Sequence, residues 1–481
     1  MSTILISDGI PGPKGYPVVG IMPKLRRDAL GFLSETVRTY GDIVCLRRGR
    51  LYLLNHPDYV QRVFRDKRAI YCKNKRAASS KNSSADPKNG ANGNGGRTRR
   101  FILGANSVAL SEGEIWRGQR SMVQPVFSRN HFTGLSAAVT STTAAMLAQW
   151  RATATNAIPL DIEQEMRGLI LKVLVKALFG NSLKSDEQVE TIVQAVADTH
   201  EFFDSRVGRL ISIPESLPTP ANRRFHRARQ TLTSFISQTI TERRNSGQFG
   251  TDLLGLLSSS KDPKTGDGLS LTQLQDELLM LSILGHKTTA TALTWTFYLL
   301  SGSRTVEDRL HQEIVTSLGG RSATLDDLPK LGYVRQVLEE SMRLYPPTWI
   351  IGRVALQDDV IGGYTLPAGA TVLLSPYLLH RHAGFWDAPE SFNPDRFSRD
   401  RLPGGPFPAY LPFGDGERIC IASHFALMQM SLVLAEVVGN YRLELAPGPP
   451  LQPSPRAVLR PRNGLKMFLH TRTGTVRANA V

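Results

Sequence analysis

The sequence predicts a mainly α protein with a smaller β region, an α+β fold. Residues 112–345 read as a succession of helices, with apolar residues at helical spacing in segments such as MRGLILKVLVKALFG and FHRARQTLTSFISQTITERR. Short strand-like runs lie on either side of that part of the chain, and no internal repeat is visible. With 481 residues, 41% of them hydrophobic, the chain can bury a large core.

The elements follow in a simple order. Residues 11–70 mix Pro and Gly turns with the strand-like runs DIVCLR and LYLLNH, which indicates a small strand-bearing lobe. Residues 272–301 are apolar on most sides and predict one central helix about 45 Å long. Pro346 and Pro347 end a later helix, short strands and turns follow, and a last helix begins at about Ala422.

The polar segment 73–100 is rich in Asn, Gly, Ser and Lys and is predicted to be a disordered surface insertion. The chain carries a net charge of +16, of which this segment contributes +7, so that +9 remains for the other 453 residues. A basic chain raises the possibility of a nucleic-acid partner. We expect none, because no aromatic residue lies between these charges to stack on bases.

Cysteine usage and hydropathy bear on the compartment. Three cysteines, at positions 45, 72 and 420, are too few and too scattered for a disulfide framework. No run of eighteen apolar residues occurs, and the apolar patch near the N-terminus is soon interrupted by Gly and Pro. We therefore expect a cytoplasmic protein with neither a signal peptide nor a membrane anchor.

Cys420 is the candidate with the most chemistry around it. It stands just ahead of an apolar helix, whose free N–H groups and positive dipole end stabilise a thiolate. Gly414 and Gly416 permit a tight turn and a close backbone approach to whatever the sulfur binds. Arg418 adds a cation that can pair with an anionic group of the same ligand. The alternative is an ordinary buried thiol before a helix.

The sequence before the last helix resembles the haem-binding loop of the cytochrome P450 family, F-x-x-G-x-R-x-C-x-G, at four positions: Phe413, Gly416, Arg418 and Cys420. The resemblance implies a single P450 domain over residues 1–481, of the soluble bacterial type without a fused reductase. It also implies haem b, iron protoporphyrin IX, with the Cys420 thiolate as axial ligand of the iron. The chain departs from the pattern at Ala422, where the family has Gly, and Ala is the smallest possible change.

A second matching segment contains Glu340 and Arg343, three residues apart on one predicted helix, where neighbouring side chains can pair. The family has E-x-x-R on this helix and a third partner downstream, which corresponds to Arg396. The resemblance implies that the three side chains form a buried ion network under the haem loop. Its role is expected to be structural and not catalytic.

Other residues are matched to the haem carboxylates. Trp116 and Arg120 are four residues apart and correspond to the family's W-x-x-x-R, whose side chains reach the haem propionates. Arg353, in the strand after the Glu340 helix, is a third propionate partner by the same resemblance, alongside Arg418. Each of these arginines taken alone could also be a surface residue.

The central helix carries LGHKTTA where the family typically has A-G-x-[D/E]-T-[T/S]. Gly285, Thr288 and Thr289 match, and we assign them, with Lys287, to the catalytic centre. Thr288 corresponds to the family's threonine that hydrogen-bonds dioxygen and relays protons from a locally opened helix. The alternative is a helical threonine that bonds the carbonyl four residues earlier.

Two residues of this segment depart from the family pattern. Leu284 replaces a small Ala, so the pocket over the iron is expected to be tighter or differently shaped. Lys287 replaces an acid and reverses the local charge. If the acid normally helps to bring protons in, the lysine must do so with a lowered pKa, point outward, or leave the relay to water.

The expected activity is that of a monooxygenase, which inserts one oxygen atom of O₂ into a hydrophobic small molecule such as a terpenoid, fatty acid or polyketide, by hydroxylation or epoxidation. No flavin or NAD fingerprint occurs, so a separate ferredoxin or flavodoxin with its reductase is expected to supply electrons, and we expect a monomer. One alternative is a haem-thiolate peroxygenase, isomerase or dehydratase that needs no external electrons, for which Lys287 is the only support. Another is a haem-binding sensor or inactive carrier.

Overall fold

The computed structural model describes residues 9–16, 19–73, 102–154, 158–206, 214, 216–398, 400 and 407–472. The predicted insertion at 73–100 lies outside the described residues, except for Lys73. Compact packing divides the chain into two units, one within Met1–Pro87 and Glu339–Cys420 and the other within Lys88–Leu338 and Ile421–Val481. The mainly α fold with a smaller β region is confirmed, whereas the single domain stays a prediction.

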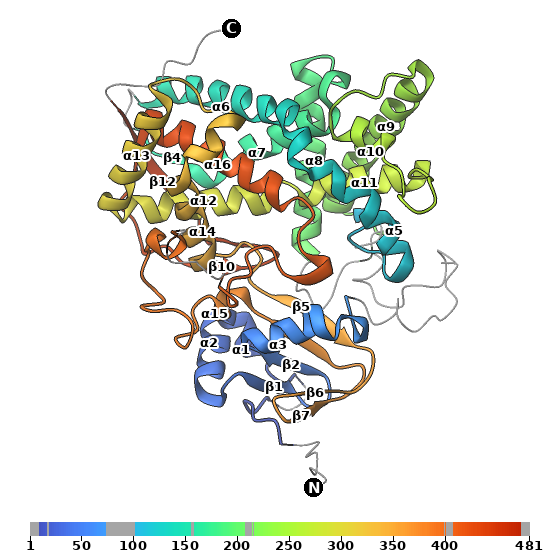
Figure 1. Ribbon diagram of the computed structural model, residues 1–481, viewed down its shortest axis with the longest axis vertical. Helices are drawn as coiled ribbons and strands as arrows, with labels where there is room; N and C mark the ends of the chain where they lie inside the picture. The colour runs from blue at the N-terminus through green and yellow to red at the C-terminus, as the bar shows by residue number, and fades with distance from the viewer. Residues whose placement is uncertain are drawn as a thin grey trace. The chain divides into compact units, whose positions relative to one another are not determined.

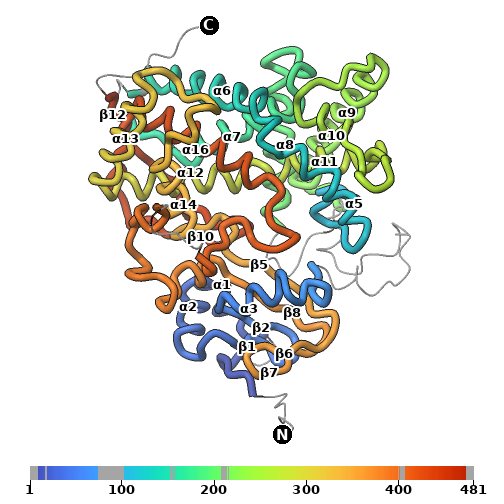
Figure 2. Tube along the Cα trace, in the orientation of Figure 1, coloured from blue at the N-terminus to red at the C-terminus, as the bar shows by residue number. Residues whose placement is uncertain are grey.

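The first unit is built on a five-stranded sheet in the order β1-β2-β8-β5-β3 (Figure 1). Strands from the start of the chain pair there with strands some 300 residues later, since β2 and β8 run parallel with Leu53 opposite Leu373 (Figure 2). The runs DIVCLR and LYLLNH are confirmed as strands. The strands are β1 (Ile43–Arg47), β2 (Leu51–Leu54), β3 (Tyr71–Cys72), β5 (Ile351–Ala355) and β8 (Thr371–Leu374), with the hairpin β6 (Asp359–Ile361) and β7 (Tyr364–Leu366).

Short helices complete the first unit. Apolar side chains of α2 such as Leu33 pack on one side of the sheet, together with Val44 and Leu53. The helices are α1 (Met22–Arg27), α2 (Ala29–Tyr40), α3 (Pro57–Gln61) and α15 (Pro376–Leu379), and the shorter helical turns are η1 (Arg62–Asp66), η2 (Arg68–Ile70), η7 (Pro394–Phe397) and η9 (Gly416–Arg418).

The second unit is helical. Its helices are α5 (Gly113–Val123), α6 (Phe132–Ala154), α7 (Ile162–Phe179), α8 (Asp186–Arg206), α9 (Pro220–Ser246), α10 (Leu253–Ser259), α11 (Leu271–Leu284), α12 (Lys287–Ser301), α13 (Arg304–Leu318), α16 (Ser423–Asn440) and most of α14 (Gly332–Leu344), with the helical turns η3 (Gln124–Phe127), η4 (Arg129–His131), η5 (Gly180–Ser182) and η6 (Leu325–Lys330). Its strands are β4 (Leu160–Asp161), β9 (Tyr441–Leu445) and β12 (Lys466–Thr471) in one sheet, and β10 (Pro453–Pro455) and β11 (Leu459–Pro461) in another.

The core of the second unit lies among α6, α7, α12 and α16, which pack against one another (Figure 1). A helix that is apolar on most sides belongs in such an interior, and α16 has buried residues all along its length. On α12 the fully buried Trp295 donates its indole N–H to the Leu459 carbonyl oxygen over 2.7 Å. No helix among the described residues is long and apolar enough to span a membrane.

The expected unbroken helix over residues 272–301 is wrong. Two helices, α11 and α12, stand in its place, with Gly285 and His286 between them. The Gly285 N–H closes α11 on the Leu281 carbonyl oxygen at 2.9 Å. A Cβ at Gly285 would lie 2.7 Å from that oxygen and 3.1 Å from Cδ2 of Leu174 on α7, so a tertiary contact favours glycine at the interruption. The apolar pattern continues across it and does not indicate the break.

We expect Gly285→Ala to lower the free energy of unfolding by about 1–3 kcal/mol, because its Cβ is forced against the Leu281 carbonyl and Leu174. Gly302→Ala is the matched control: Gly302 also follows a helix with negative φ, and its Cβ would lie an ordinary 3.7 Å from the nearest atom, the Leu299 carbonyl oxygen. Urea unfolding followed by circular dichroism measures both variants. Equal midpoints would contradict crowding at Gly285.

Candidate functional site

The Cys420 loop is a tight turn closed by backbone hydrogen bonds. The Cys420 N–H donates to the Phe413 carbonyl oxygen over 3.0 Å, and the Ile419 N–H donates to that of Gly416 over 3.1 Å. Gly414 and Gly416 have φ of 77° and 68°, a region that favours glycine. Cys420 is exposed, so its side chain is accessible to a ligand.

The loop is held from one side by η1 and η2. A Cβ at Gly416 would lie 2.3 Å from the Phe64 carbonyl oxygen, so the two backbones touch and only glycine fits. The two carboxylates that flank Gly416 pair with arginines, Asp415 with Arg65 through hydrogen bonds of 2.8 and 2.7 Å, and Glu417 with Arg68 at 3.2 Å. Sequence reasoning missed these partners because Arg65 and Asp415 are 350 residues apart.

Ala422, the departure from the family's Gly, caps α16. Its φ of −102° and ψ of 19° lie outside the left-handed region, so alanine adopts this conformation without strain. The Ala426 N–H donates to its carbonyl oxygen over 2.8 Å and begins the helix. The substitution therefore leaves the end of the loop intact.

Glu340 and Arg343 form a fully buried ion pair on α14. Arg343 donates from Nε and Nη2 to Oε2 and Oε1 of Glu340 over 2.7 and 2.8 Å, the bidentate geometry of a strong pair. Arg396 donates from Nε to Glu340 Oε1 over 3.4 Å, and the Asn393 N–H donates to the same oxygen over 2.9 Å. The three residues expected in an ion network therefore lie together.

His380 joins this network to the segment that leads into the Cys420 loop. Burial lowers the pKa of His380 to about 3, so the ring is neutral. Its Nε2 accepts from the Leu411 N–H over 2.7 Å, which leaves Nδ1 to donate to the Arg343 carbonyl oxygen over 3.1 Å. Leu411 stands two residues before Phe413. Sequence reasoning missed His380, since the histidines of LLHRH match no motif.

The residues matched to haem carboxylates are divided between the two units. Trp116 is buried and Arg120 half-buried on α5, in the second unit. Arg353 is buried on β5 with its guanidinium 4.8 Å from the centre of the Phe64 ring, and Arg418 is half-buried in the loop itself. Arg353 and Arg418 thus share the first unit with Cys420.

The threonines of α12 differ in what their hydroxyl groups bind. Thr294 donates to the carbonyl oxygen of Ala290 over 2.8 Å, the arrangement usual for a threonine inside a helix. Thr288, in the first turn, is half-buried, and its hydroxyl has no hydrogen-bond partner among the described residues. Thr289 beside it is buried. The Thr288 hydroxyl is therefore not used by its own helix.

Lys287 is buried in the same turn, so of the three alternatives for this lysine, the outward-pointing side chain is not the one that the structure has. Its ammonium forms an ion pair with Asp204 near the end of α8. Burial lowers the pKa of Lys287 to about 8, and the nearby cations Arg460 and Arg167 act in the same direction. Sequence reasoning missed Asp204. By contrast Leu284, the other departure, is 36% exposed at the end of α11.

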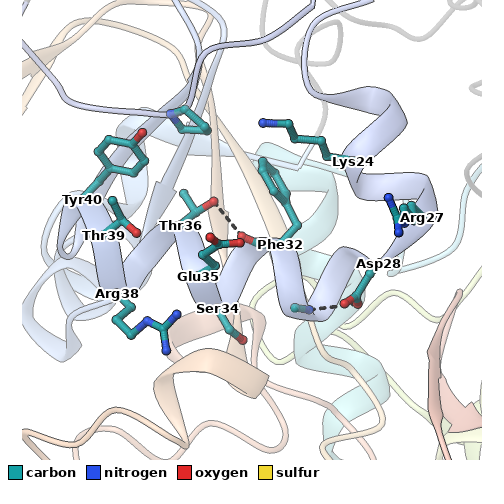
Figure 3. Close-up of a pocket in the computed structure, with 12 residues that line it drawn as sticks. Lys24, Arg27, Asp28, Phe32, Ser34, Glu35, Thr36, Arg38, Thr39 and Tyr40 are labelled. Carbon is teal, nitrogen blue, oxygen red and sulfur yellow. Dashed lines mark hydrogen bonds between the residues drawn. The ribbon is translucent and has the colours of Figure 1, made fainter.

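A separate hollow of about 730 Å³ lies against α1 and α2, and its lining includes Lys24, Phe32 and Glu35 (Figure 3). Asp28 at its edge accepts a hydrogen bond of 3.0 Å from the Gly31 N–H and so caps α2. None of the lining residues belongs to the motifs, and we assign the hollow no chemistry.

The donor chemistry of the first unit suits an iron porphyrin. Such a group needs an axial ligand for its iron and cations for its carboxylates. Cys420 offers an exposed soft sulfur, and Arg353 and Arg418 offer guanidinium groups that bind carboxylates with two parallel hydrogen bonds. The residues that are present therefore fit haem b.

Comparison with known proteins agrees with this interpretation. The family model of cytochrome P450 matches residues 10–468. Cyclooctat-9-en-7-ol 5-monooxygenase of Streptomyces melanosporofaciens is 35% identical over 91% of this chain and 90% of its own length. Pentalenene oxygenase of Streptomyces avermitilis is 29% identical over 96% and 97%. The crystal structure of the cytochrome P450DA heme domain shares the fold, with a TM-score of 0.82 at 24% identity over 97% of this chain and 98% of that one.

We expect Glu340→Ala to lower the free energy of unfolding by about 3–5 kcal/mol, because it leaves the Arg343 guanidinium buried without its carboxylate. Glu114→Ala is the matched control, since Glu114 and Arg117 pair at the same spacing on an exposed face, where the loss stays below about 1 kcal/mol. Urea midpoints measure both losses. An E340A midpoint equal to that of E114A would contradict a structural role for the buried pair.

Proposed function

The chain belongs to the cytochrome P450 family, and on that basis we propose that it is a monooxygenase that inserts one oxygen atom of O₂ into a terpenoid, by hydroxylation or epoxidation. The observation that carries the proposal is the exposed Cys420 in a loop closed on Phe413. The names of the relatives that oxidise cyclooctat-9-en-7-ol and pentalenene support the substrate class. A separate ferredoxin or flavodoxin with its reductase supplies the electrons.

The chain's own residues hold the cofactor. Cys420 would provide the thiolate ligand, and Arg353 and Arg418 of the same unit would bind the propionates. Trp116 and Arg120 are proposed for the same carboxylates on the resemblance alone. When bound, the haem supplies the redox-active iron that activates dioxygen. The Glu340 network and its link through His380 fix the loop, so the sulfur does not have to be ordered when the cofactor binds.

Residues at the interruption of the central helix hold and transfer protons in the proposed reaction. Thr288 holds a proton at Oγ and donates it to the oxygen substrate, a role supported by a hydroxyl that does not bond its own helix among the described residues. Gly285 keeps the helix open one turn before it, and the next residue, Thr289, is buried. Leu284 limits the space for substrate.

An enzyme that needs no external electrons, such as a peroxygenase, isomerase or dehydratase, is the alternative. Its support was the reversed charge at Lys287. Because Asp204 pairs with the ammonium, the positive charge of the lysine itself is balanced. We therefore favour the monooxygenase, and turnover with peroxide or without reductant is the outcome that would favour the alternative.

The reduced protein with carbon monoxide is expected to give the red-shifted Soret band of a thiolate-ligated haem. Cys420→Ala is expected to abolish the band because it removes the sulfur ligand. Cys45→Ala is the control, since Cys45 lies half-buried in β1, and it should keep the band. Absorbance spectra of the haem-loaded proteins decide the assignment. A full haem complement without that band, or a band that survives in C420A, would contradict Cys420 as the ligand.

Thr288→Ala is expected to uncouple electron use from product formation. With NADH, a surrogate ferredoxin system and a terpenoid chosen by its Soret shift, product per NADH should fall at least about tenfold, because proton transfer by a positioned group is lost. Thr294→Ala is the control, as the Thr294 hydroxyl donates to the Ala290 carbonyl oxygen of its own helix, and its coupling should stay within about twofold. Equal coupling in both variants would count against the role of Thr288.

A further inference from the structure

A cluster of buried titratable side chains lies behind the interruption of the central helix, within the second unit. Lys287 of α12 pairs with Asp204 of α8. His200, one turn earlier on α8, has its Nδ1 3.7 Å from Asp204 Oδ2. The ring of His200 meets that of His286 edge to face, with centres 5.0 Å apart. We call these four residues the α8–α12 cluster.

The polar atoms of the cluster are only partly satisfied. Oδ1 of Asp204 and Nδ1 of His286 are both buried with no hydrogen-bond partner in the part of the chain that the structure describes. An unbonded buried polar atom costs free energy, so such atoms mark places where protons or small polar molecules are handled. Only Asp204 has much contact with solvent, with 18% of its side chain exposed, against 11% for Lys287 and 9% for His200.

The charge state of the cluster follows from its surroundings. Burial lowers the pKa of His286 to about 4 and that of His200 well below its usual value, so both rings are neutral. The lysine and the aspartate are the charged members. The charged groups that act on Lys287 from neighbouring elements are Glu163 and Arg167 of α7, and Arg456 and Arg460 of the β10–β11 segment.

We propose that Asp204 is a positioning residue that keeps Lys287 as an exchangeable proton donor beside Thr288, with His200 and His286 as neutral members of the same proton path. This inference rests on the proposed function. In each cycle the Lys287 ammonium releases one proton toward the Thr288 hydroxyl and becomes a neutral amine. It regains one from a hydronium ion at the exposed edge of Asp204, so the cluster returns to its starting charge.

Two features indicate that Lys287 donates a proton and is not merely one half of a structural ion pair with Asp204. A lysine whose pKa lies near 8 releases a proton far more readily than an ordinary lysine. The carboxylate lies on α8, and the ammonium belongs to the first turn of α12, one residue before Thr288, whose hydroxyl its own helix does not use. Asp204 thus takes the place of the acid that the family carries at position 287, from another helix.

The first test measures Lys287 itself. The pKa of Lys287 is followed by NMR of lysine labelled with ¹³C at Cε, in the diamagnetic reduced carbon monoxide complex, with the signal assigned by its absence in Lys287→Arg. Asp204→Asn is expected to lower this pKa by at least one pH unit, a tenfold change, because it removes the anion that stabilises the ammonium. Asp198→Asn is the matched control, since Asp198 lies on the same helix with its side chain equally 18% exposed and faces Arg224. An unchanged Lys287 pKa in D204N would overturn the positioning role.

The second test separates proton donation from charge. Lys287→Arg keeps a cation opposite Asp204, but a guanidinium does not release its proton at working pH. It is expected to retain the Soret band and the urea midpoint while product per NADH falls several-fold, and coupling equal to that of the unchanged protein would overturn the donor. The K287R variant tests proton donation by Lys287 even if the D204N variant does not fold. If the unchanged protein makes product without reductant, the proposed function fails, whereas the NMR titration still decides whether Asp204 sets the pKa of Lys287.

Discussion

The buried pair of Glu340 and Arg343 is the interaction on which the first unit depends. Its guanidinium donates to the Glu340 carboxylate and to carbonyl oxygens of His380, Pro389 and Ser391, so one side chain joins segments that the sequence separates by up to 48 residues. A buried pair contributes little net stability relative to an apolar replacement, but losing one partner is severe. The pair therefore serves mainly to specify one arrangement of the chain, since only one arrangement of these segments provides acceptors for all the donors of the guanidinium.

Two sets of contacts fix the position of the Cys420 loop. One leads from α14 through the neutral ring of His380 to Leu411. The other comes from η1, through Arg65 and the contact of Gly416 with the Phe64 backbone. The loop between these attachments is fixed while Cys420 remains exposed. A rigid ligand loop lowers the entropy lost on binding and fixes the direction of the sulfur.

Local sequence patterns correctly predicted the features that depend on residues close together in the chain. The short strands β1 and β2, the helix α16 and the pairing of Glu340 with Arg343 all arise within a few residues. The interruption at Gly285 was missed because it depends on Leu174 of another helix, and the apolar period continues across it. His380, Arg65 and Asp204 were missed for the same reason: each acts through a partner far away in the chain, and only the folded structure shows the pair.

The lysine at position 287 shows why the sign of a charge is a weak guide to chemistry in a buried site. A charged group in an interior is tolerated when an opposite charge and hydrogen bonds compensate it, so the balance of the pair matters more than the sign at one position. Here Asp204 restores the balance, and the reversed charge alone does not argue for a different reaction class. The carboxylate that pairs with Lys287 lies on another helix, α8. Any movement of α8 relative to α12 within the second unit would then alter the protonation of Lys287, a coupling that an acid on α12 itself would not provide.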